Sequence, residues 1–445
     1  MADKPFDELL SRIEGLTAKV AILGLGYVGL PLAVTTARSG LHVTGFDIDD
    51  KKVDQLYAGH SYIGAVADQD LADLRKAGRV SWTSDFSQLA DMDVFVICVP
   101  TPLTAHREPD LSYVISTTQE IARHIKQGSL VALESTTYPG TTDEVLTPIL
   151  AQSGFKLGDD IFIGFSPERE DPGNITYNTN TIPKIVAGDG PEASQLMEAF
   201  YRKVVRDVVP VSKTRTAEAI KITENIFRAV NIALVNELKV IFDAMDIDVW
   251  EVIDGAATKP FGFMPFYPGP GLGGHCIPID PFYLTWKARE YHLSTRFIEL
   301  AGEINSNMPD YVISRLREVI DRRLGIGLSK ARILIIGIAY KKNVSDMRES
   351  PAVRLLSLLR DAGASVQFHD PHVPQIPRMR EYPELLGYKS TAFQNIDPAE
   401  LDAILIATDH DNVDYAALAE MNLPIIDTRN AMQKRNLAMD NVEKA

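Results

Sequence analysis

The chain has 445 residues, of which 45% are hydrophobic and 24% charged, values typical of a globular protein and unlike those of a disordered or fibrous one. At roughly 100–200 residues per domain, this length predicts two to four domains. The formal net charge of −15 argues against sequence-independent binding of nucleic acid, which requires a basic surface.

The N-terminal half alternates apolar runs with helical segments. Its start predicts a βαβ unit, with a strand, a glycine-rich turn, a helix and a second strand at residues 19–23, 24–29, 30–39 and 42–46. Further strands are predicted at 94–99, 130–133, 161–165 and 185–186, and helices at 111–125 and 142–150. Because such alternation is typical of parallel sheets covered on both faces, we expect a doubly wound domain over residues 1–211.

The pattern changes near residue 212. Residues 214–245 have a helical period and contain no Gly or Pro, which is enough for a helix of roughly 45 Å. The following segment, 259–280, is too rich in Pro, Gly and aromatic residues to be regular structure. More helix is predicted up to about residue 323, so we expect a central helical domain over residues 212–323.

Alternating strand and helix patterns resume after residue 324. Strands are predicted at 331–336, 365–369, 403–407 and 424–427 and a helix at 353–362, whereas the last dozen residues are expected to be a frayed tail or a helix. Residues 324–445 should thus form a second, smaller α/β domain. The expected fold class is α/β, with two Rossmann-like doubly wound parallel sheets joined by a long central helix, which amounts to a weak internal duplication.

The glycine-rich turn predicts a dinucleotide site. Gly24, Gly26 and Gly29 follow a strand and open a helix, where they allow a tight turn, a close approach of a pyrophosphate and close helix–strand packing. Asp47 ends the next strand, about where a carboxylate would accept hydrogen bonds from ribose hydroxyls. Because this carboxylate would repel a 2′-phosphate, the pattern favours NAD over NADP, although a turn of this kind can also bind nothing.

The two cysteines lie in different contexts. Cys98 belongs to the apolar run VFVICVP, which predicts a buried, inert thiol, whereas Cys276 lies in the glycine-rich stretch GLGGHCIPID, which leaves its sulfur accessible. Since a free thiol has a pKa of about 8.5, Cys276 would need a nearby cation or donor to act as a nucleophile. Two cysteines make no disulfide framework, and the polar N-terminus is unlike a secretory signal, so a cytoplasmic protein is expected.

Three further segments carry polar side chains at suggestive places. Lys221 and Asn225 share one face of the central helix, where they form either a solvated stripe or a buried pair able to orient water. Residues 165–174 follow a strand and form either a ligand loop or a solvated turn. Residues 339–351 occupy the phosphate-loop position of the second α/β domain without GxGxxG, so lysine and arginine would have to hold a nucleotide there.

Together these motifs resemble the UDP-glucose/GDP-mannose dehydrogenase family of nucleotide-sugar 6-dehydrogenases over nearly the whole chain. The matching stretches are ILGLGYVGLPLA, VPTP, ESTTYPGTT, FSPEREDPGN, AEAIKITENIFRAVNIALVNEL, PGPGLGGHCIPIDP and YKKNVSDMRESPA. The resemblance implies an NAD domain and a UDP-binding domain joined by a long helix that forms the core of a homodimer, or of a larger homo-oligomer. It implies oxidation of the sugar C6 hydroxymethyl to a carboxylate by two NAD, without a metal.

The resemblance also implies a role for Cys276. Its thiolate would attack the intermediate aldehyde, and the resulting thiohemiacetal would lose the second hydride to become a thioester that water hydrolyses. Lys221 would stabilise the developing oxyanion and Asn225 would add a second donor. Asp280 would help to activate water together with Lys221 or Thr136, while Glu168 would lie near the reacting carbon.

The ligand contacts that the resemblance implies fall into two sets. The NAD contacts are Gly24, Gly26, Tyr27, Val28, Gly29, Asp47, Thr101, Thr136 and Arg348. The UDP-sugar contacts are Glu168, Arg169, Lys221, Asn225, Phe266, Tyr267, Gly273 and Lys342, with Lys184 as a further candidate and Lys259 in place of an arginine that reaches the substrate from the neighbouring subunit.

The loop after the strand at 161–165 bears on the substrate. UDP-glucose members usually carry a second glutamate four positions beyond the first, but Pro172 stands there in this chain, as in members that oxidise N-acetylated UDP-hexosamines for surface polysaccharides. We therefore expect UDP-N-acetylglucosamine, with Arg169 able to hydrogen-bond the N-acetyl group. UDP-N-acetylgalactosamine, UDP-N-acetylmannosamine and UDP-glucose are alternatives. Two more distant alternatives for the function are a two-electron hydroxyacid dehydrogenase and a non-enzymatic sensor of NAD or UDP-sugar.

Overall fold

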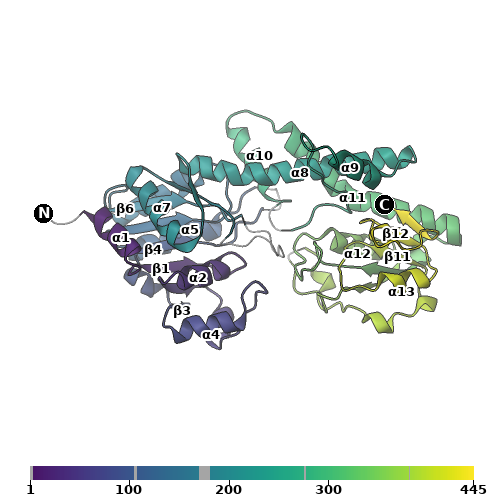
Figure 1. Ribbon diagram of the computed structural model, residues 1–445, viewed down its shortest axis with the longest axis horizontal. Helices are drawn as coiled ribbons and strands as arrows, with labels where there is room; N and C mark the ends of the chain where they lie inside the picture. Colours follow the sequence, from purple (N-terminus) through teal and green to yellow (C-terminus); the bar gives the residue numbers. More distant parts are fainter. Residues whose placement is uncertain (1–3, 105–107, 170–180, 275–276, 380) are drawn as a thin grey trace. The chain divides into compact units, whose positions relative to one another are not determined.

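The computed structural model describes residues 4–104, 108–169, 181–274, 277–379 and 381–445 (Figure 1). The chain divides into two compact units: unit 1 comprises Met1–Glu224 and Phe282–Leu293, and unit 2 comprises Asn225–Pro281 and Ser294–Ala445. The boundary falls inside the long helix, and the expected division into three domains stays a prediction. In the described part of the chain, no helix combines the length and the apolar character needed to cross a bilayer.

Unit 1 is built on an eight-stranded sheet with the order β3-β2-β1-β4-β5-β6-β7-β8. Its strands are β1 (Lys19–Leu23), β2 (His42–Phe46), β3 (Val80–Thr83), β4 (Val94–Ile97), β5 (Ser129–Leu133), β6 (Ile161–Phe165), β7 (Lys184–Gly188) and β8 (Val208–Pro210). The six strands from β3 to β6 are parallel, as predicted, but β7 pairs with β6 in the antiparallel direction. A run of apolar residues does not encode strand direction, so the sequence pattern could not reveal this reversal.

Helices cover both faces of this sheet (Figure 1). The helices are α1 (Pro5–Glu14), α2 (Gly29–Arg38), α3 (Asp50–Tyr57), α4 (Asp68–Lys76), α5 (Ser112–His124), α6 (Thr147–Leu150) and α7 (Pro191–Val204). One layer contains α1, α7, α2 and α4 in successive contact, and alternate strand residues such as Val20 and Ile22 pack into it. The other layer contains α5 and α6 in mutual contact. The carboxyl ends of the parallel strands therefore remain uncovered by these layers, as in other doubly wound sheets.

The long central helix is confirmed as α8 (Thr214–Ala244). It is followed by α9 (Val249–Ala257), α10 (Asp280–Glu290) and α11 (Arg296–Leu324). The described residues between α9 and α10 contain neither helix nor strand, as the Pro and Gly content of that segment predicts.

Unit 2 carries a five-stranded parallel sheet with the order β10-β9-β11-β12-β13. Its strands are β9 (Arg332–Ile336), β10 (Ser365–His369), β11 (Ala403–Ile406), β12 (Ile425–Asp427) and β13 (Val442–Lys444), and its helices include α12 (Pro351–Asp361) and α13 (Tyr415–Glu420). The expectation of a frayed or helical C-terminal tail is wrong, because β13 pairs with the open edge of β12 and Ala445 is buried. A three-residue strand is too short for its alternation to be visible in sequence.

The two sheets begin with the same local motif, which supports the internal duplication. In unit 1 the N–H of Gly24 (φ 92°) donates to a β2 carbonyl at 2.8 Å, and the next N–H donates to Asp47 at 2.9 Å. In unit 2 the N–H of Gly337 (φ 78°) donates to a β10 carbonyl at 2.9 Å, and the next N–H donates to Asp370 at 2.7 Å. Each sheet thus places a glycine turn and a carboxylate at the carboxyl ends of its first two strands.

The edge position of β13 yields a stability prediction. Deleting residues 442–445 removes the parallel ladder with β12 and the Ala445 N–H bond to the Asp427 carbonyl, and it exposes the β12 edge. At about 0.5–1.5 kcal/mol for each lost hydrogen bond, we expect a loss of about 2 kcal/mol or more, measured by urea unfolding. The control is Glu443→Gln, which breaks only the ion pairs with Arg322 and Arg323 and should cost less than about 1 kcal/mol. Equal losses in both variants would contradict this account.

Candidate active site

The glycine-rich turn of unit 1 has the geometry that a dinucleotide requires. Gly24 lies in the left-handed region, and a Cβ atom on it would lie 2.8 Å from the Cys98 carbonyl oxygen. A Cβ on Gly29 would lie only 1.8 Å from the Gly24 oxygen, so this position packs helix against strand. A Cβ on Gly26 would meet nothing within 4 Å, which leaves open space beside the turn for a pyrophosphate.

Asp47 is held rigidly at the end of β2. Its side chain accepts hydrogen bonds from the N–H groups of Leu25 at 2.9 Å and Asp49 at 3.0 Å, and it lies 3.4 Å from the Lys52 ammonium. Tyr62, which the sequence motifs do not identify, donates its hydroxyl to the Leu25 carbonyl at 2.7 Å. Burial, with the nearby carboxylates Asp47 and Asp49, raises the pKa of Tyr62, so its hydroxyl stays a donor. The turn and the carboxylate are therefore positioned by the fold itself.

The predicted NAD contacts Thr101 and Thr136 lie together. Thr101 follows β4 and Thr136 follows β5, and the Thr101 hydroxyl donates to the Thr136 carbonyl at 2.7 Å. The hydroxyl of Tyr283, a fully buried residue of α10 that sequence reasoning missed, donates to the Thr101 carbonyl. The predicted contacts Tyr27 and Val28 lie on the glycine turn, where Tyr27 is 45% exposed.

The first turns of α8 hold the loop that contains Thr136. The buried carboxylate of Glu218 accepts from Gly140 N–H at 2.5 Å, from Thr142 N–H at 2.9 Å and from the Thr142 hydroxyl at 2.7 Å. Burial raises the pKa of Glu218 against the effect of these donors. Lys221 stands three residues farther along α8 and is only 7% exposed, and its ammonium has no hydrogen-bond or ion-pair partner among the described residues.

Glu168 belongs to a buried charge cluster. The Lys184 ammonium lies 2.8 Å from a Glu134 oxygen and 3.0 Å from a Glu168 oxygen, and the Tyr201 hydroxyl donates to Glu134 at 2.5 Å. Burial raises the pKa of Glu134, although Lys184 opposes the shift. Burial alone would lower the pKa of Lys184, but the two carboxylates outweigh it and raise that pKa. Lys184 is thus a paired lysine within the protein.

Arg169 is also engaged. Its guanidinium donates to both carboxylate oxygens of Glu224 on α8, at 2.5 and 3.2 Å, and to the Pro183 carbonyl at 2.8 Å. The residues from Glu170 to Asn180, including Pro172, lie outside the described residues.

Asn225 and Asp280 form a buried pair within unit 2. The Asn225 amide donates to the Asp280 carboxylate at 2.6 Å, and both residues are at most 5% exposed. Asp280 is the first residue of α10. His275 and the predicted nucleophile Cys276 lie outside the described residues.

The glycine loop before Cys276 is packed against the second α/β domain. A Cβ on Gly273 would lie 2.7 Å from Tyr340 Cβ and 2.9 Å from Pro351, and Gly274 N–H donates to the Arg348 carbonyl at 3.1 Å. The guanidinium of Arg348 is paired with Asp346 at 2.6 Å. Larger residues at these two glycines would displace the loop.

The remaining predicted substrate residues of unit 2 make contacts of their own. The Tyr267 hydroxyl donates to Asp254 at 2.6 Å, and the half-buried Phe266 packs edge to face with Phe227, 5.8 Å between ring centroids. The Lys342 ammonium lies 2.6 Å from the Asp411 carboxylate. The exposed Lys259 lies over the Phe261 ring, 5.0 Å from its centroid.

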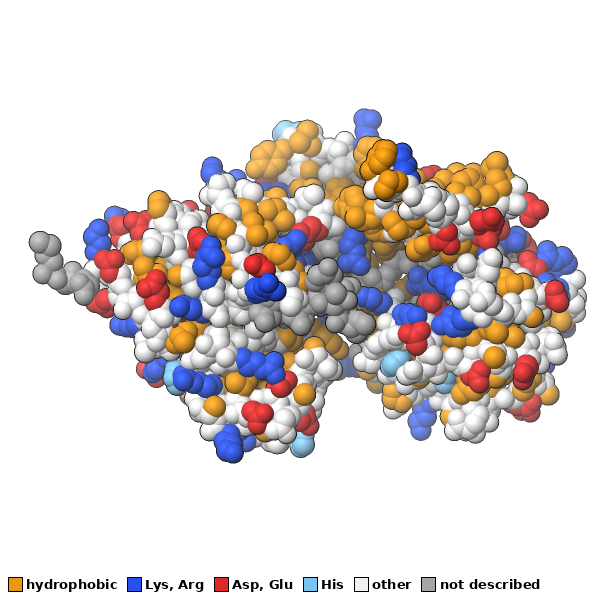
Figure 2. Space-filling model, in the orientation of Figure 1, with side chains coloured by type: hydrophobic (Ala, Val, Ile, Leu, Met, Phe, Trp, Pro, Cys, Tyr) orange, Lys and Arg blue, Asp and Glu red, His pale blue; other side chains and the backbone are white. Residues whose placement is uncertain are grey.

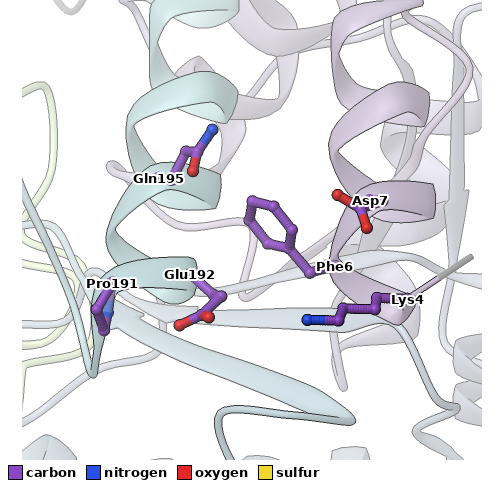
Figure 3. Close-up of a pocket in the computed structure, with 6 residues that line it drawn as sticks. All are labelled: Lys4, Phe6, Asp7, Pro191, Glu192 and Gln195. Carbon is purple, nitrogen blue, oxygen red and sulfur yellow. The ribbon is translucent and has the colours of Figure 1, made fainter.

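A separate pocket of about 300 Å³ lies between α1 and α7 in unit 1 (Figure 3). It is lined by Lys4, Phe6, Asp7, Pro191, Glu192 and Gln195. Pro191 follows the carboxyl end of β7, and β7 is antiparallel to β6, so this pocket lies at the edge of the sheet opposite to the glycine turn. It therefore has no part in the site described above.

Comparisons with known proteins show the family to which the chain is similar. Three domain models of one family match the chain: the NAD-binding domain of the UDP-glucose/GDP-mannose dehydrogenase family over residues 18–205, its central domain over 215–307 and its UDP-binding domain over 334–434. A UDP-N-acetyl-D-glucosamine 6-dehydrogenase from Pseudomonas aeruginosa is 38% identical, over 82% of this chain and 85% of that protein. An NDP-N-acetyl-D-galactosaminuronic acid dehydrogenase from Ralstonia nicotianae is 32% identical, over 94% and 97%. The solved structure of UDP-D-ManNAc dehydrogenase from Pyrococcus horikoshii, 32% identical, has a TM-score of 0.84 and covers 96% of this chain and 98% of its own.

The glycine turn of this NAD-binding domain yields a prediction for two variants, one expected to lose stability and the other expected to lose only NAD affinity. Gly29→Ala should distort the turn because its Cβ would overlap a backbone oxygen, and we expect a stability loss of about 1–3 kcal/mol together with loss of NAD binding. Gly26→Ala should fold as the unchanged protein does, but it should bind NAD about tenfold more weakly, about 1.4 kcal/mol, because the methyl group fills the open space.

Thermal unfolding and calorimetric titration with NAD measure the two effects. Gly327→Ala is the matched control, since that glycine also faces open space but lies in unit 2, and it should change neither quantity. Undiminished NAD affinity in Gly26→Ala would refute the assigned role of the turn.

Proposed function

Because the chain belongs to the UDP-glucose/GDP-mannose dehydrogenase family and is therefore an NAD-dependent nucleotide-sugar dehydrogenase, we propose that it oxidises C6 of a UDP-N-acetylhexosamine to the carboxylate. UDP-N-acetylglucosamine is the foremost candidate substrate. The reaction would take place in the cytoplasm, and its product would serve the synthesis of surface polysaccharide. Support for the hexosamine class comes from the relatives: the three described above act, by their names, on N-acetylated glucosamine, galactosamine and mannosamine derivatives.

The environment of Lys221 carries the proposal. A buried ammonium without a counter-charge is costly, since burial removes its hydration. Lys221 is 7% exposed and has no partner among the described residues, so an anionic group on a ligand would relieve this cost. The alkoxide that forms when a sugar hydroxyl loses its proton, and the later oxyanion, are such groups.

The chain's own residues divide the remaining work. NAD, when bound, accepts hydride from the sugar C6. Cys276 adds as a thiolate to the C6 aldehyde, which restores a tetrahedral carbon able to lose a second hydride and leaves a thioester. Asn225, fixed by its bond to Asp280, supplies a second donor to the oxyanion, and Asp280 takes a proton from the water that hydrolyses the thioester. Glu168 lies beside that water.

The mechanism predicts a stoichiometry that separates the candidate functions. We expect two NADH for each sugar consumed, measured by absorbance at 340 nm with a panel of UDP-sugars, and the highest kcat/KM with UDP-N-acetylglucosamine. One NADH would indicate a two-electron dehydrogenase, and none a sensor.

Cys276→Ser should abolish acid formation while UDP-sugar and NAD affinities stay within about twofold, because serine lacks an easily formed thiolate.

We also propose that the protein is a homodimer through α8. Apolar side chains lie exposed on the unit 2 part of α8 and on the following segment: Phe227, Leu234, Val240, Ile241, Met245, Ile247 and Val252. Figure 2 shows hydrophobic side chains gathered in this region of the surface. Exposed apolar side chains gathered in one region are stabilised by burial against a partner. Lys259, on the exposed segment beyond α9, would then be available to a neighbouring subunit.

The dimer proposal predicts a change of sedimentation. Leu234 and Ile241 are 50% and 46% exposed and lie seven residues apart, so they share a face of α8. Leu234→Glu with Ile241→Glu should convert the dimer to a folded monomer in sedimentation velocity, since burying two carboxylates is unfavourable. Leu386→Glu, at a leucine that is 60% exposed elsewhere in unit 2, is the control and should leave the dimer unchanged. A monomeric unchanged protein would refute the proposal.

A further inference from the structure

Lys184 is enclosed by two carboxylates of unequal exposure. The side chain of Lys184 is 4% exposed, that of Glu134 is 0% exposed and that of Glu168 is 13% exposed. Glu134 is therefore a counter-charge enclosed by the protein, and Glu168 is the member of the cluster that reaches the surface. A ligand at the carboxyl edge of the sheet would meet Glu168 and neither of the other two.

The antiparallel pairing of β7 explains how a strand residue comes to this edge. The register pairs Gly164 with Gly188 and Phe165 with Ala187. Continued three residues beyond the end of β6, the same register sets Glu168 opposite Lys184, in agreement with their 3.0 Å contact. Had β7 been parallel to β6, its first residue would lie at the opposite edge of the sheet, far from Glu168.

The carboxylate of Glu168 is fixed from two sides. One oxygen accepts from the Lys184 ammonium, and the other accepts from the Arg169 N–H at 2.6 Å. The Arg169 guanidinium is clamped in turn to Glu224, three residues after Lys221 on α8. The loop after β6 is thus tied to β7 on one side and, on the other, to the helix that carries Lys221.

We propose that Lys184, backed by Glu134, is a positioning residue that aims the Glu168 carboxylate and keeps it ionised for the hydrolytic half of the reaction, and that Arg169 and Glu224 hold the same loop. This inference rests on the proposed function. It gives Lys184 and Arg169, which are both paired within unit 1, a positioning role, and their contact with the UDP-sugar stays a prediction. Among the described residues, the titratable groups around Glu168 include Lys184 on β7, Glu134 after β5, Cys98 after β4 and Arg169 with its partner Glu224 on α8, while Tyr201 on α7 bonds Glu134.

The test compares Lys184→Met with Lys184→Arg. Removing the cation should raise the pKa of the Glu168 carboxyl, so the acidic limb of the kcat–pH profile should move to higher pH, by about 1–3 pH units. At neutral pH we expect kcat to fall about tenfold or more, while the KM values for NAD and UDP-sugar change less than about threefold. Two NADH should form rapidly in the first turnover, after which a sugar thioester on Cys276 should accumulate and be detected by mass spectrometry. Lys184→Arg should restore most of kcat.

Glu134→Gln should shift the acidic limb in the opposite direction, and it tests the proposal even if Lys184→Met does not fold. It removes a negative charge while the amide oxygen can still accept from Lys184 and Tyr201. Glu168 is then the one carboxylate of the pair left beside Lys184, so its ionised form is favoured and the acidic limb should move to lower pH. A purely structural role predicts no such reversal of sign between the two variants.

Lys287→Met is the matched control. Lys287 is also a buried lysine of unit 1, with a side chain 6% exposed between Glu144 and Glu290, but it does not contact Glu168. Its loss should lower the unfolding temperature and leave the acidic limb unchanged. If the folded Lys184→Met protein keeps the original profile, or shifts no more than Lys287→Met, this inference is wrong while the proposed function stands. If the unchanged protein oxidises no UDP-sugar, both are wrong.

Discussion

Two carboxylates of α8 fasten two loops of the candidate active site in unit 1 to the helix that carries Lys221. Glu218 accepts three hydrogen bonds from Gly140 and Thr142 in the loop after β5, and Glu224 binds Arg169 in the loop after β6. The spacing of three residues places both on the side of the helix that also presents Lys221. Charge-assisted hydrogen bonds are stronger than neutral ones, so the two loops and Lys221 form one positioned assembly.

Much of the fold could be predicted because strand and helix periods are local properties. The glycine turn, the strand that ends at Asp47 and the 31-residue helix α8 all follow from residues close in sequence. Strand direction is not local, and neither is the pairing of a three-residue strand. For that reason the sequence did not reveal the antiparallel direction of β7 or the C-terminal strand β13. It also did not reveal that Lys184, the first residue of β7, lies at the carboxyl edge of the sheet.

The residues of the candidate site differ in the same way, because some depend on the local sequence and others on tertiary contacts. The turn at Gly24, Gly26 and Gly29 could be predicted from spacing alone, because its geometry depends on the backbone of one short segment. Glu134 and Tyr283 could not, since each acts on a residue distant in sequence: Glu134 on Lys184, and Tyr283 on Thr101. A buried glutamate directly after a strand was the available signal for Glu134, but only tertiary contacts identify its partner.

The duplicated turn in unit 2 shows why one motif serves two purposes. Asp47 accepts two backbone hydrogen bonds, and the Lys52 ammonium lies 3.4 Å from it. Its carboxylate therefore has acceptor sites left for ribose hydroxyls. Asp370 accepts four backbone N–H groups and Nε2–H of the buried His410, whose Nδ1 accepts from Asn343. Although burial opposes it, these donors lower the pKa of Asp370. Because a carboxylate has about four acceptor sites, Asp370 is saturated, and a nucleotide in the second domain must be held by other groups, such as Lys342 beside the loop that His410 positions.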